Sequence, residues 1–285
     1  MQTIDTKEDA LALIATLEAG ATRHAVPTGG GRVVWRQWGS GPVLALLHGG
    51  HGSWLHWVRN IPALAAQHTL LVPDMPGFGE SDDLDGDPHA PDRLDQLADV
   101  LTASLAMLVG PSQPIGLAAF SFGAMAASAL VARRSVQRLA LIGAGGHGTA
   151  RRQPMKMIDW RLDDPEAMRA ALRHNLHALM LRDPAAIDAL ALEVHQRSCL
   201  ATRFRSRDIS MAGQLRQAFD RLDAPLLLLW GRDDVTGDPE VAGPKMVDGR
   251  PQREWGAIEG AGHWAQFERA GDVNQRLLGW FAPEG

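Results

Sequence analysis

The sequence predicts an α/β protein with a mostly parallel sheet, helices on both faces and a helical block inserted between two strands. Two observations lead to this prediction. Short apolar runs, most of them closed by glycine or proline, alternate with helical patterns, which is typical of strands buried on both faces of a sheet. One long stretch, residues 148–221, interrupts the alternation because it contains no such run.

Six apolar runs are expected to form strands, at residues 33–35, 43–47, 70–74, 115–119, 139–142 and 226–230. Apolar residues at helical spacing predict helices at residues 6–17, 91–108 and 122–132. Thr6 is expected to cap the first of these helices, with Asp9 in a position resembling a capping box.

The stretch without strands is rich in alanine, leucine and arginine, and Pro154, Pro165 and Pro184 divide it into several expected helices. A helical block between two strands of one sheet forms a cap over that sheet. We therefore predict a core domain made of residues 1–147 and 222–285 and a helical cap or lid at residues 148–221. Such a cap carries much of the substrate specificity of an enzyme.

Composition excludes several classes of function. The net charge of −5 provides no basic face for nucleic acid. The N-terminus does not read as a secretory signal, and no apolar stretch approaches the roughly 18 residues that span a bilayer. With Cys199 as its single cysteine the chain cannot form an internal disulfide, so a cytoplasmic protein without membrane partners is predicted. A homo-oligomer is compatible with the sequence but not specified by it.

The candidate nucleophile is Ser121 in Ala119-Phe120-Ser121-Phe122-Gly123. This segment leaves an apolar strand and begins a helix of small residues, so the serine is expected at a sharp corner with its hydroxyl raised above the sheet. The small residues Ala119 and Gly123 allow strand and helix to approach each other. The alternative is a serine that only caps a helix, and the segment alone does not decide between the two.

Glycines in His48-Gly49-Gly50-His51-Gly52 follow an earlier strand and let backbone N–H groups point into a cavity. The amides of Gly50 and Phe122 are the predicted oxyanion hole, although the glycines taken alone favour a plain tight turn. No carboxylate or cysteine stands at ligand spacing from the histidines here, so neither a metal nor a cofactor is predicted.

The predicted acid is Asp234, which follows a late strand, because its neighbour Asp233 is expected to face outward. The predicted base is His263, in a glycine-flanked loop near the C-terminus. An Asp-rich turn and a surface histidine are the respective alternatives. Together the order Ser121, Asp234, His263 predicts acyl transfer to water on a small carbonyl substrate, with Asp234 orienting the imidazole.

The chain resembles the α/β-hydrolase superfamily over nearly its whole length, which implies the α/β-hydrolase fold. The resemblance rests on His48-Gly49-Gly50, Asp74-Met75-Pro76-Gly77-Phe78-Gly79-Glu80-Ser81, the serine corner, Trp230-Gly231-Arg232-Asp233-Asp234 and Gly262-His263-Trp264. Residues 230–234 and 262–268, with Trp54 and Arg59-Asn60, are similar to the meta-cleavage product hydrolases, which cut carbon–carbon bonds in vinylogous 1,5-diketones.

That resemblance implies that Trp264 lines the substrate site and that Arg197 of the cap matches the arginine that holds the substrate's carboxylate. Gly49 and Phe120, beside the predicted oxyanion hole and nucleophile, are also expected to bind the substrate. The nucleophile segment departs from the Gly-Asn-Ser-Met-Gly of that group, since Phe120 replaces the polar residue. A carboxylesterase or lactonase therefore stays open beside the C–C hydrolase, as does a non-catalytic ligand-binding homologue. A serine at position 121 argues against epoxide hydrolases and haloalkane dehalogenases, which attack with a carboxylate there.

Overall fold

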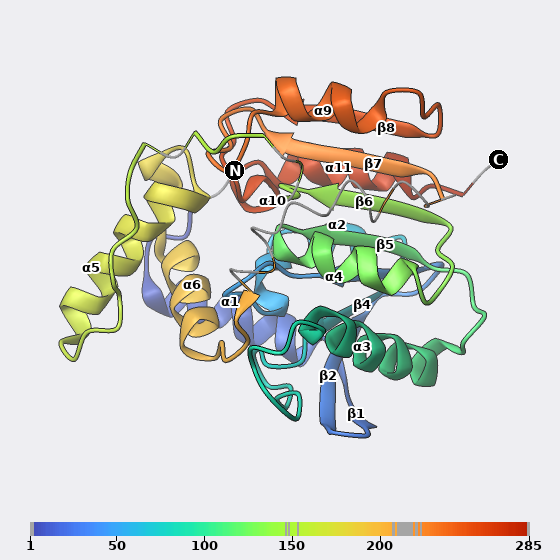
Figure 1. Cartoon of the computed structure of the whole chain (residues 1–285). Helices are drawn as coiled ribbons and strands as arrows, with labels where there is room; N and C mark the ends of the chain where they lie inside the picture. The colour runs from blue at the N-terminus through green and yellow to red at the C-terminus, as the bar shows by residue number, and fades with distance from the viewer. Residues whose placement is uncertain are drawn as a thin grey trace.

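The computed structural model describes residues 3–145, 147, 149–152, 154–206, 209, 219, 222 and 224–283. An eight-stranded sheet runs through the molecule in the order β1-β2-β4-β3-β5-β6-β7-β8 (Figure 1). Strand β2 pairs antiparallel with β1 and β4, and all other neighbours are parallel. The strands are β1 (Thr22–Thr28), β2 (Gly31–Trp38), β3 (Val43–Leu47), β4 (Thr69–Asp74), β5 (Gly116–Phe120), β6 (Arg138–Ile142), β7 (Leu226–Gly231) and β8 (Arg253–Ile258).

The predicted mostly parallel sheet is confirmed, and each of the six expected runs lies in or overlaps a strand. In β3, Leu44 and Leu46 join the core on one face of the sheet, whereas Ala45 and Leu47 join the core on the other. Successive side chains of a strand point to opposite faces, so a strand covered on both sides has to be apolar at every position. This requirement explains the continuous apolar runs.

Helices cover both faces of the sheet. One core contains residues of α3 (Arg93–Val109), α4 (Phe122–Val131) and α9 (Pro239–Val247). The other contains residues of the 3₁₀ turn η1 (Trp54–Trp57) and of α2 (Ile61–Ala65), α10 (Ala265–Glu268) and α11 (Ala270–Trp280). None of the helices in the described ranges combines the length and apolar character that crossing a bilayer requires.

Within the segment predicted to be a cap, residues 165–200 are mostly helical, whereas the described residues 149–152 and 154–164 form neither helix nor strand. The segment contains α5 (Pro165–Asn175), the π-helical turn η2 (Leu176–Met180), the 3₁₀ turn η3 (Pro184–Ala186) and α6 (Ala189–Leu200). In Figure 1 these elements lie together at the end of the sheet toward which the arrowheads of β6 and β7 point. Parallel strands place ligands at their carboxyl ends, so the helical block adjoins the edge where a site is expected. Its division from the core as a separate domain stays a prediction.

The N-terminal helix α1 (Lys7–Ala19) begins at Thr6, whose hydroxyl accepts the Asp9 N–H at 3.1 Å, in the capping arrangement that the sequence predicts. Its buried Ala10 and Ile14 share a core with α6. The other end of α1 is bonded to β2, where the Trp38 indole donates to the Leu17 carbonyl at 2.8 Å. Helix α1 therefore contacts both the sheet and the helical block.

Gly123, two residues after Ser121, lies where α4 presses on β3. A Cβ at this position would stand 2.6 Å from the His48 carbonyl oxygen and 2.9 Å from that of Leu47. Gly123→Ala is therefore expected to lower the free energy of unfolding by about 1–3 kcal/mol, as overpacking does. Urea denaturation measures the change.

The matched control is Gly279→Ala in α11, where a Cβ would meet no atom within 4 Å. This variant is expected to keep or raise the stability by up to about 1 kcal/mol, since alanine favours helix. Equal stabilities for the two variants would contradict a close contact at Gly123.

Candidate active site

Ser121 occupies a strained corner between β5 and α4. Its φ of 51° and ψ of −117° lie in a region that residues with a Cβ seldom adopt. The turn is fixed by the Ser121 N–H, which donates to the Ile142 carbonyl of the adjacent strand at 2.9 Å. The corner raises the hydroxyl at the carboxyl edge of the sheet and leaves Phe122 as the first residue of α4.

The side chains of Ser121, His263 and Asp234 form one hydrogen-bonded line. The Ser121 Oγ lies 2.9 Å from His263 Nε2, and His263 Nδ1 lies 2.9 Å from the Asp234 Oδ2. Because the carboxylate can only accept, Nδ1–H donates to Asp234 and Nε2 accepts from the serine. Asp234 is fully buried and His263 is 4% exposed, so the acid and the imidazole are shielded from water, whereas Ser121 is partly exposed.

Asp234 is held by its own turn. Its Oδ1 accepts the Thr236 N–H at 2.8 Å and the Thr236 hydroxyl at 2.7 Å. Burial acts to raise the pKa of Asp234, but the charge of a protonated His263 and the hydrogen bonds from His263 and Thr236 keep this pKa below its usual value. Asp234 is therefore a carboxylate at neutral pH. The neighbouring Asp233 is 41% exposed in its side chain and pairs with Arg182 at 2.6 Å.

The end of β6 explains why the acid follows β7. Gly143 has φ 55°, and a Cβ there would lie 3.0–3.1 Å from atoms of His263. An acidic side chain at this position would push the imidazole away. The end of β7 has no such conflict, and the loop after it brings Asp234 to the side of the ring opposite Ser121.

Two buried histidines brace the glycine-rich loop after β3. His48 Nε2 accepts the Met75 N–H at 3.0 Å, so its Nδ1–H donates to the Gly49 carbonyl at 2.8 Å. His56 Nδ1 accepts the Gly49 N–H at 3.2 Å. Both rings must be neutral to accept these bonds. Burial lowers the pKa of His48 to about 4 and that of His56 well below its usual value.

Anchoring of the Gly49 carbonyl also fixes the peptide that carries the Gly50 N–H. In a trans peptide the C=O and N–H point in opposite directions, so the Gly50 N–H is turned away from His48. Among the described residues, neither the Gly50 N–H nor the Phe122 N–H has a hydrogen-bond partner. Two free donors beside Ser121 are what a developing oxyanion requires.

Histidines buried in the neutral form make stability depend on pH. Burial also lowers the pKa of His195 to about 4. Below the ordinary histidine pKa of about 6.5, these histidines bind protons in the unfolded chain but not in the folded chain. The free energy of unfolding is therefore highest above that pH. It falls as the pH drops toward 4, by about 3 kcal/mol each for His48 and His195. Urea unfolding at about pH 7.5 and about pH 5 measures the change.

The control for this pH effect is His195→Leu, which removes one of the rings whose pKa burial strongly lowers, at a buried position. Its stability is expected to vary less between the two pH values than that of the unchanged protein. Identical free energies at both pH values in the unchanged protein would contradict the prediction.

The residues predicted to line the substrate site lie in different environments. Phe120 is fully buried, with its ring centroid 5.1 Å from that of His263 and 5.4 Å from that of His56. Trp264 is buried too, and its indole donates to the His56 carbonyl at 3.1 Å. Gly49 packs against the corner, because a Cβ there would lie 3.2 Å from that of Ser121. The two rings and Gly49 therefore adjoin the hydrogen-bonded line.

Arg197 is placed differently. Its side chain is 45% exposed and donates to Glu193 one helical turn earlier at 2.7 Å. The structure therefore pairs it within α6, and its predicted role in holding a carboxylate stays a prediction.

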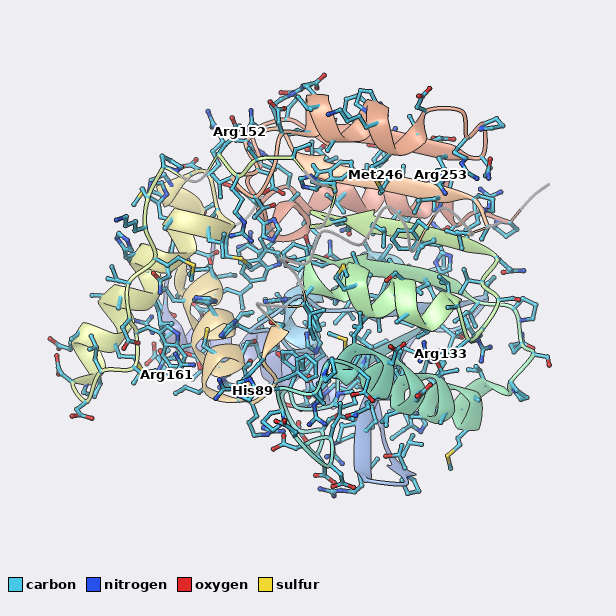
Figure 2. All side chains as sticks on the ribbon, viewed as in Figure 1. His89, Arg133, Arg152, Arg161, Met246 and Arg253 are labelled. Atoms are coloured by element: carbon cyan, nitrogen blue, oxygen red, sulfur yellow. The ribbon has the colours of Figure 1, made fainter. Side chains whose placement is uncertain are left out.

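Two other arginines lie near the helical block. Arg161, labelled in Figure 2, stacks over Trp160 at 4.4 Å from the ring centroid. Arg152, also labelled there, donates to the Arg232 carbonyl beside the Asp234 loop at 3.3 Å.

Thr236 and His56 support the site, and neither was singled out from the sequence for such a role. The Asp-x-Thr spacing after β7 was the available signal for Thr236, whereas no sequence pattern marks His56.

Burial raises the pKa of the Cys199 thiol to about 12, so this cysteine stays protonated. Within the described residues no group of three or more His, Cys, Asp or Glu side chains is arranged to hold a metal ion.

Comparison with known proteins adds relatives to this geometry. A 2-hydroxy-6-oxononadienedioate/2-hydroxy-6-oxononatrienedioate hydrolase of Paraburkholderia phymatum is 29% identical over 92% of this chain and 96% of its own length. A 2-hydroxy-6-oxo-6-phenylhexa-2,4-dienoate hydrolase of Burkholderia cepacia is 28% identical over 86% of this chain and 89% of its own.

Solved structures share the fold. An esterase from Rhodococcus sp. ECU1013 has a TM-score of 0.74 at 22% identity, over 93% of this chain and all of its own. The 2-hydroxy-6-oxo-6-phenylhexa-2,4-dienoate hydrolase from Rhodococcus sp. strain RHA1 has a TM-score of 0.71 at 22% identity, over 92% of this chain and 99% of its own. The sequence profile of the alpha/beta hydrolase family matches residues 44–276, most of the length of the chain. The chain therefore belongs to the alpha/beta hydrolase family.

Proposed function

We propose that the protein is a serine hydrolase in which Ser121 is the nucleophile, His263 the general base and Asp234 the acid that orients the imidazole. The observation that supports this most strongly is the hydrogen-bonded line from the Ser121 hydroxyl through His263 to Asp234, with 2.9 Å at both steps. A serine is a weak nucleophile until an adjacent base accepts its proton, and this line supplies such a base and orients it.

The reaction begins when the Ser121 oxygen attacks a substrate carbonyl carbon and its proton passes to His263 Nε2. The oxyanion then accepts hydrogen bonds from the Gly50 and Phe122 N–H groups, each worth about 3 kcal/mol to the transition state. Collapse of this intermediate expels the leaving group, which takes a proton from the imidazolium. Water, activated by the same imidazole, releases the acyl group from Ser121.

For the substrate we propose a dienone-type ring-cleavage product whose carbon–carbon bond is hydrolysed. Support comes from the relatives over nearly the full chain, two of which carry the names of 2-hydroxy-6-oxo-dienoate hydrolases. A dienol substrate has to tautomerise to its keto form before attack, so that the departing carbon leaves as a stabilised enolate. His263 is the base nearest to Ser121 for that proton transfer.

A carboxylesterase or lactonase is the second candidate, and Phe120 favours it. This residue precedes Ser121 and is fully buried between the rings of His56 and His263. It contributes an apolar wall and no hydrogen bond. An ester or lactone needs only the oxyanion donors and an apolar pocket, so an apolar residue at this position suits it.

The two candidates are separated by assaying the purified protein on a yellow ring-cleavage dienone and on p-nitrophenyl acetate. Bleaching of the dienone with a kcat/KM at least about tenfold above that for the ester supports the C–C hydrolase. The reverse preference supports the esterase. Turnover of neither compound would contradict the proposed hydrolase and favour a ligand-binding homologue. A cytoplasmic location belongs to the same proposal.

A further inference from the structure

Glu268, the last residue of α10, is a buried carboxylate for which the proposed reaction has no use. It is 4% exposed and accepts backbone N–H groups from Gly262 at 2.7 Å, Asp183 at 2.8 Å and Arg182 at 3.1 Å. Gly262 immediately precedes His263, whereas Arg182 and Asp183 connect η2 to η3 in the helical block. One side chain thus joins the loop of the imidazole to the block above it.

Two backbone contacts continue this junction on the other side of His263. The Trp264 N–H donates to the Met180 carbonyl at 2.7 Å. A Cβ on Gly262 would stand 2.8 Å from the Arg182 nitrogen and 3.1 Å from the Met180 oxygen. The segment 180–183 therefore lies directly against the residues on both sides of His263.

We propose that Glu268 is a positioning residue whose carboxylate couples the docking of segment 180–183 to the placement of His263 against Ser121. A carboxylate suits this position because its oxygens only accept, and three N–H donors converge on them. An amide or a protonated carboxyl turns a donor toward at least one of those N–H groups, so the junction loosens. The coupling to activity rests on the proposed function, since it acts through His263.

The surroundings of Glu268 make the junction sensitive to acid. Burial raises the pKa of the Glu268 carboxyl, the three N–H groups lower it in part, and the charge of Asp183 raises it further. The Arg182 guanidinium is turned to Asp233, and the imidazole of His263 is bonded to Ser121 and Asp234. Among these partners, only backbone N–H dipoles stabilise the negative charge of Glu268. The carboxylate therefore takes up a proton at a higher pH than an ordinary glutamate does.

The test is Glu268→Gln, which keeps the shape of the side chain and removes the charge. Loss of hydrogen bonds to a charged acceptor is expected to lower kcat by about 10- to 100-fold, with KM changed by less than about threefold. The ratio of unchanged to variant kcat is expected to be largest at neutral pH and to shrink as the pH falls and Glu268 takes up its proton. A merely structural role would leave this ratio independent of pH, and a constant ratio would overturn the proposal.

The control is Asp82→Asn, which changes a carboxylate to an amide in the loop beside β2, where Asp82 is bonded to Arg32. Its kcat is expected to stay within about twofold of that of the unchanged protein, because it alters only exposed contacts.

Amide hydrogen exchange supplies a second readout that does not need a substrate. Glu268→Gln is expected to speed exchange in peptides covering residues 180–183 and 260–264 together, whereas Asp82→Asn leaves both unchanged. Faster exchange in only one of the two segments would overturn the coupling. If the unchanged protein hydrolyses neither the dienone nor the ester, the proposed function fails, and the exchange result still decides whether Glu268 joins the two segments.

Discussion

Replacing Ser121 by alanine is expected to lower kcat/KM for the dienone or ester substrate by at least about 10⁴-fold. The variant removes the oxygen that attacks the carbonyl and leaves His263 and the N–H groups of Gly50 and Phe122 in place. Residual catalysis then comes only from those donors and from binding. The measurement is the initial rate on the better of the two substrates, with the dissociation constant of the variant determined separately to show that binding persists.

A matched control for Ser121→Ala is Ser128→Ala in α4, the helix that follows Ser121. Ser128 is buried, and its hydroxyl donates to the Met125 carbonyl at 2.7 Å inside α4. Loss of this bond is expected to change stability by about 1 kcal/mol and to keep activity within about twofold. Turnover that survives in Ser121→Ala but not in Ser128→Ala would show that the nucleophile has been assigned to the wrong residue.

Asp234→Asn is expected to lower kcat at neutral pH by about 10⁴-fold. The asparagine fits the same space, but its amide nitrogen can turn toward His263 Nδ1 and donate to it. The imidazole then carries its proton on Nε2, the atom that has to accept the proton of Ser121. Burial of the site leaves no water to substitute for the missing charge, because Asp234 is fully buried. Steady-state kinetics from acid to alkaline pH measure the loss.

The neighbouring aspartate supplies the control for Asp234→Asn. Asp233→Asn removes an ion pair with Arg182 in which both side chains are about half exposed, and such pairs are worth about 0–1 kcal/mol. Its kcat is expected to stay within about threefold of that of the unchanged protein. A large loss in Asp233→Asn together with a small loss in Asp234→Asn would reverse the assignment of the acid.

The interior of the sheet was predictable from the sequence, and its two edges were not. Strands β3 to β7 are covered on both faces, so apart from Thr69, Asp74 and Arg138 at strand ends their positions are apolar or glycine, and the runs stand out. Strand β1 contains Pro27 and has several exposed residues, and β8 contains Glu254 and Gly256. Edge strands tolerate proline and polar side chains because one side pairs with nothing. Their pattern therefore resembles a loop, and neither was predicted.

For the site, the sequence identified the residues that sit at strand ends and left out those that hold them. Ser121, Asp234 and His263 each follow an apolar run or a glycine pair, so local pattern is enough to single them out. Glu268 is bonded to backbone groups far away in the chain, such as that of Asp183, and His56 is bonded to the backbone of Gly49 across a folded loop. Those distances exist only after folding. A buried acid in a short helix and a histidine in an aromatic turn give no sequence signal of them.

Helix α1 limits how a substrate reaches the site. At its start the Ile4 N–H and carbonyl are bonded to Asp188 and Ala189 beside α6, and at its end the Leu17 carbonyl is bonded to Trp38 of the sheet. A swing of the whole helical block away from the sheet would have to break at least one of these attachments. Helix α5 instead packs on α6 and η2 within the block. The opening through which a molecule passes is therefore expected to form by displacement of α5 and its side chains, with α1 and α6 staying in place.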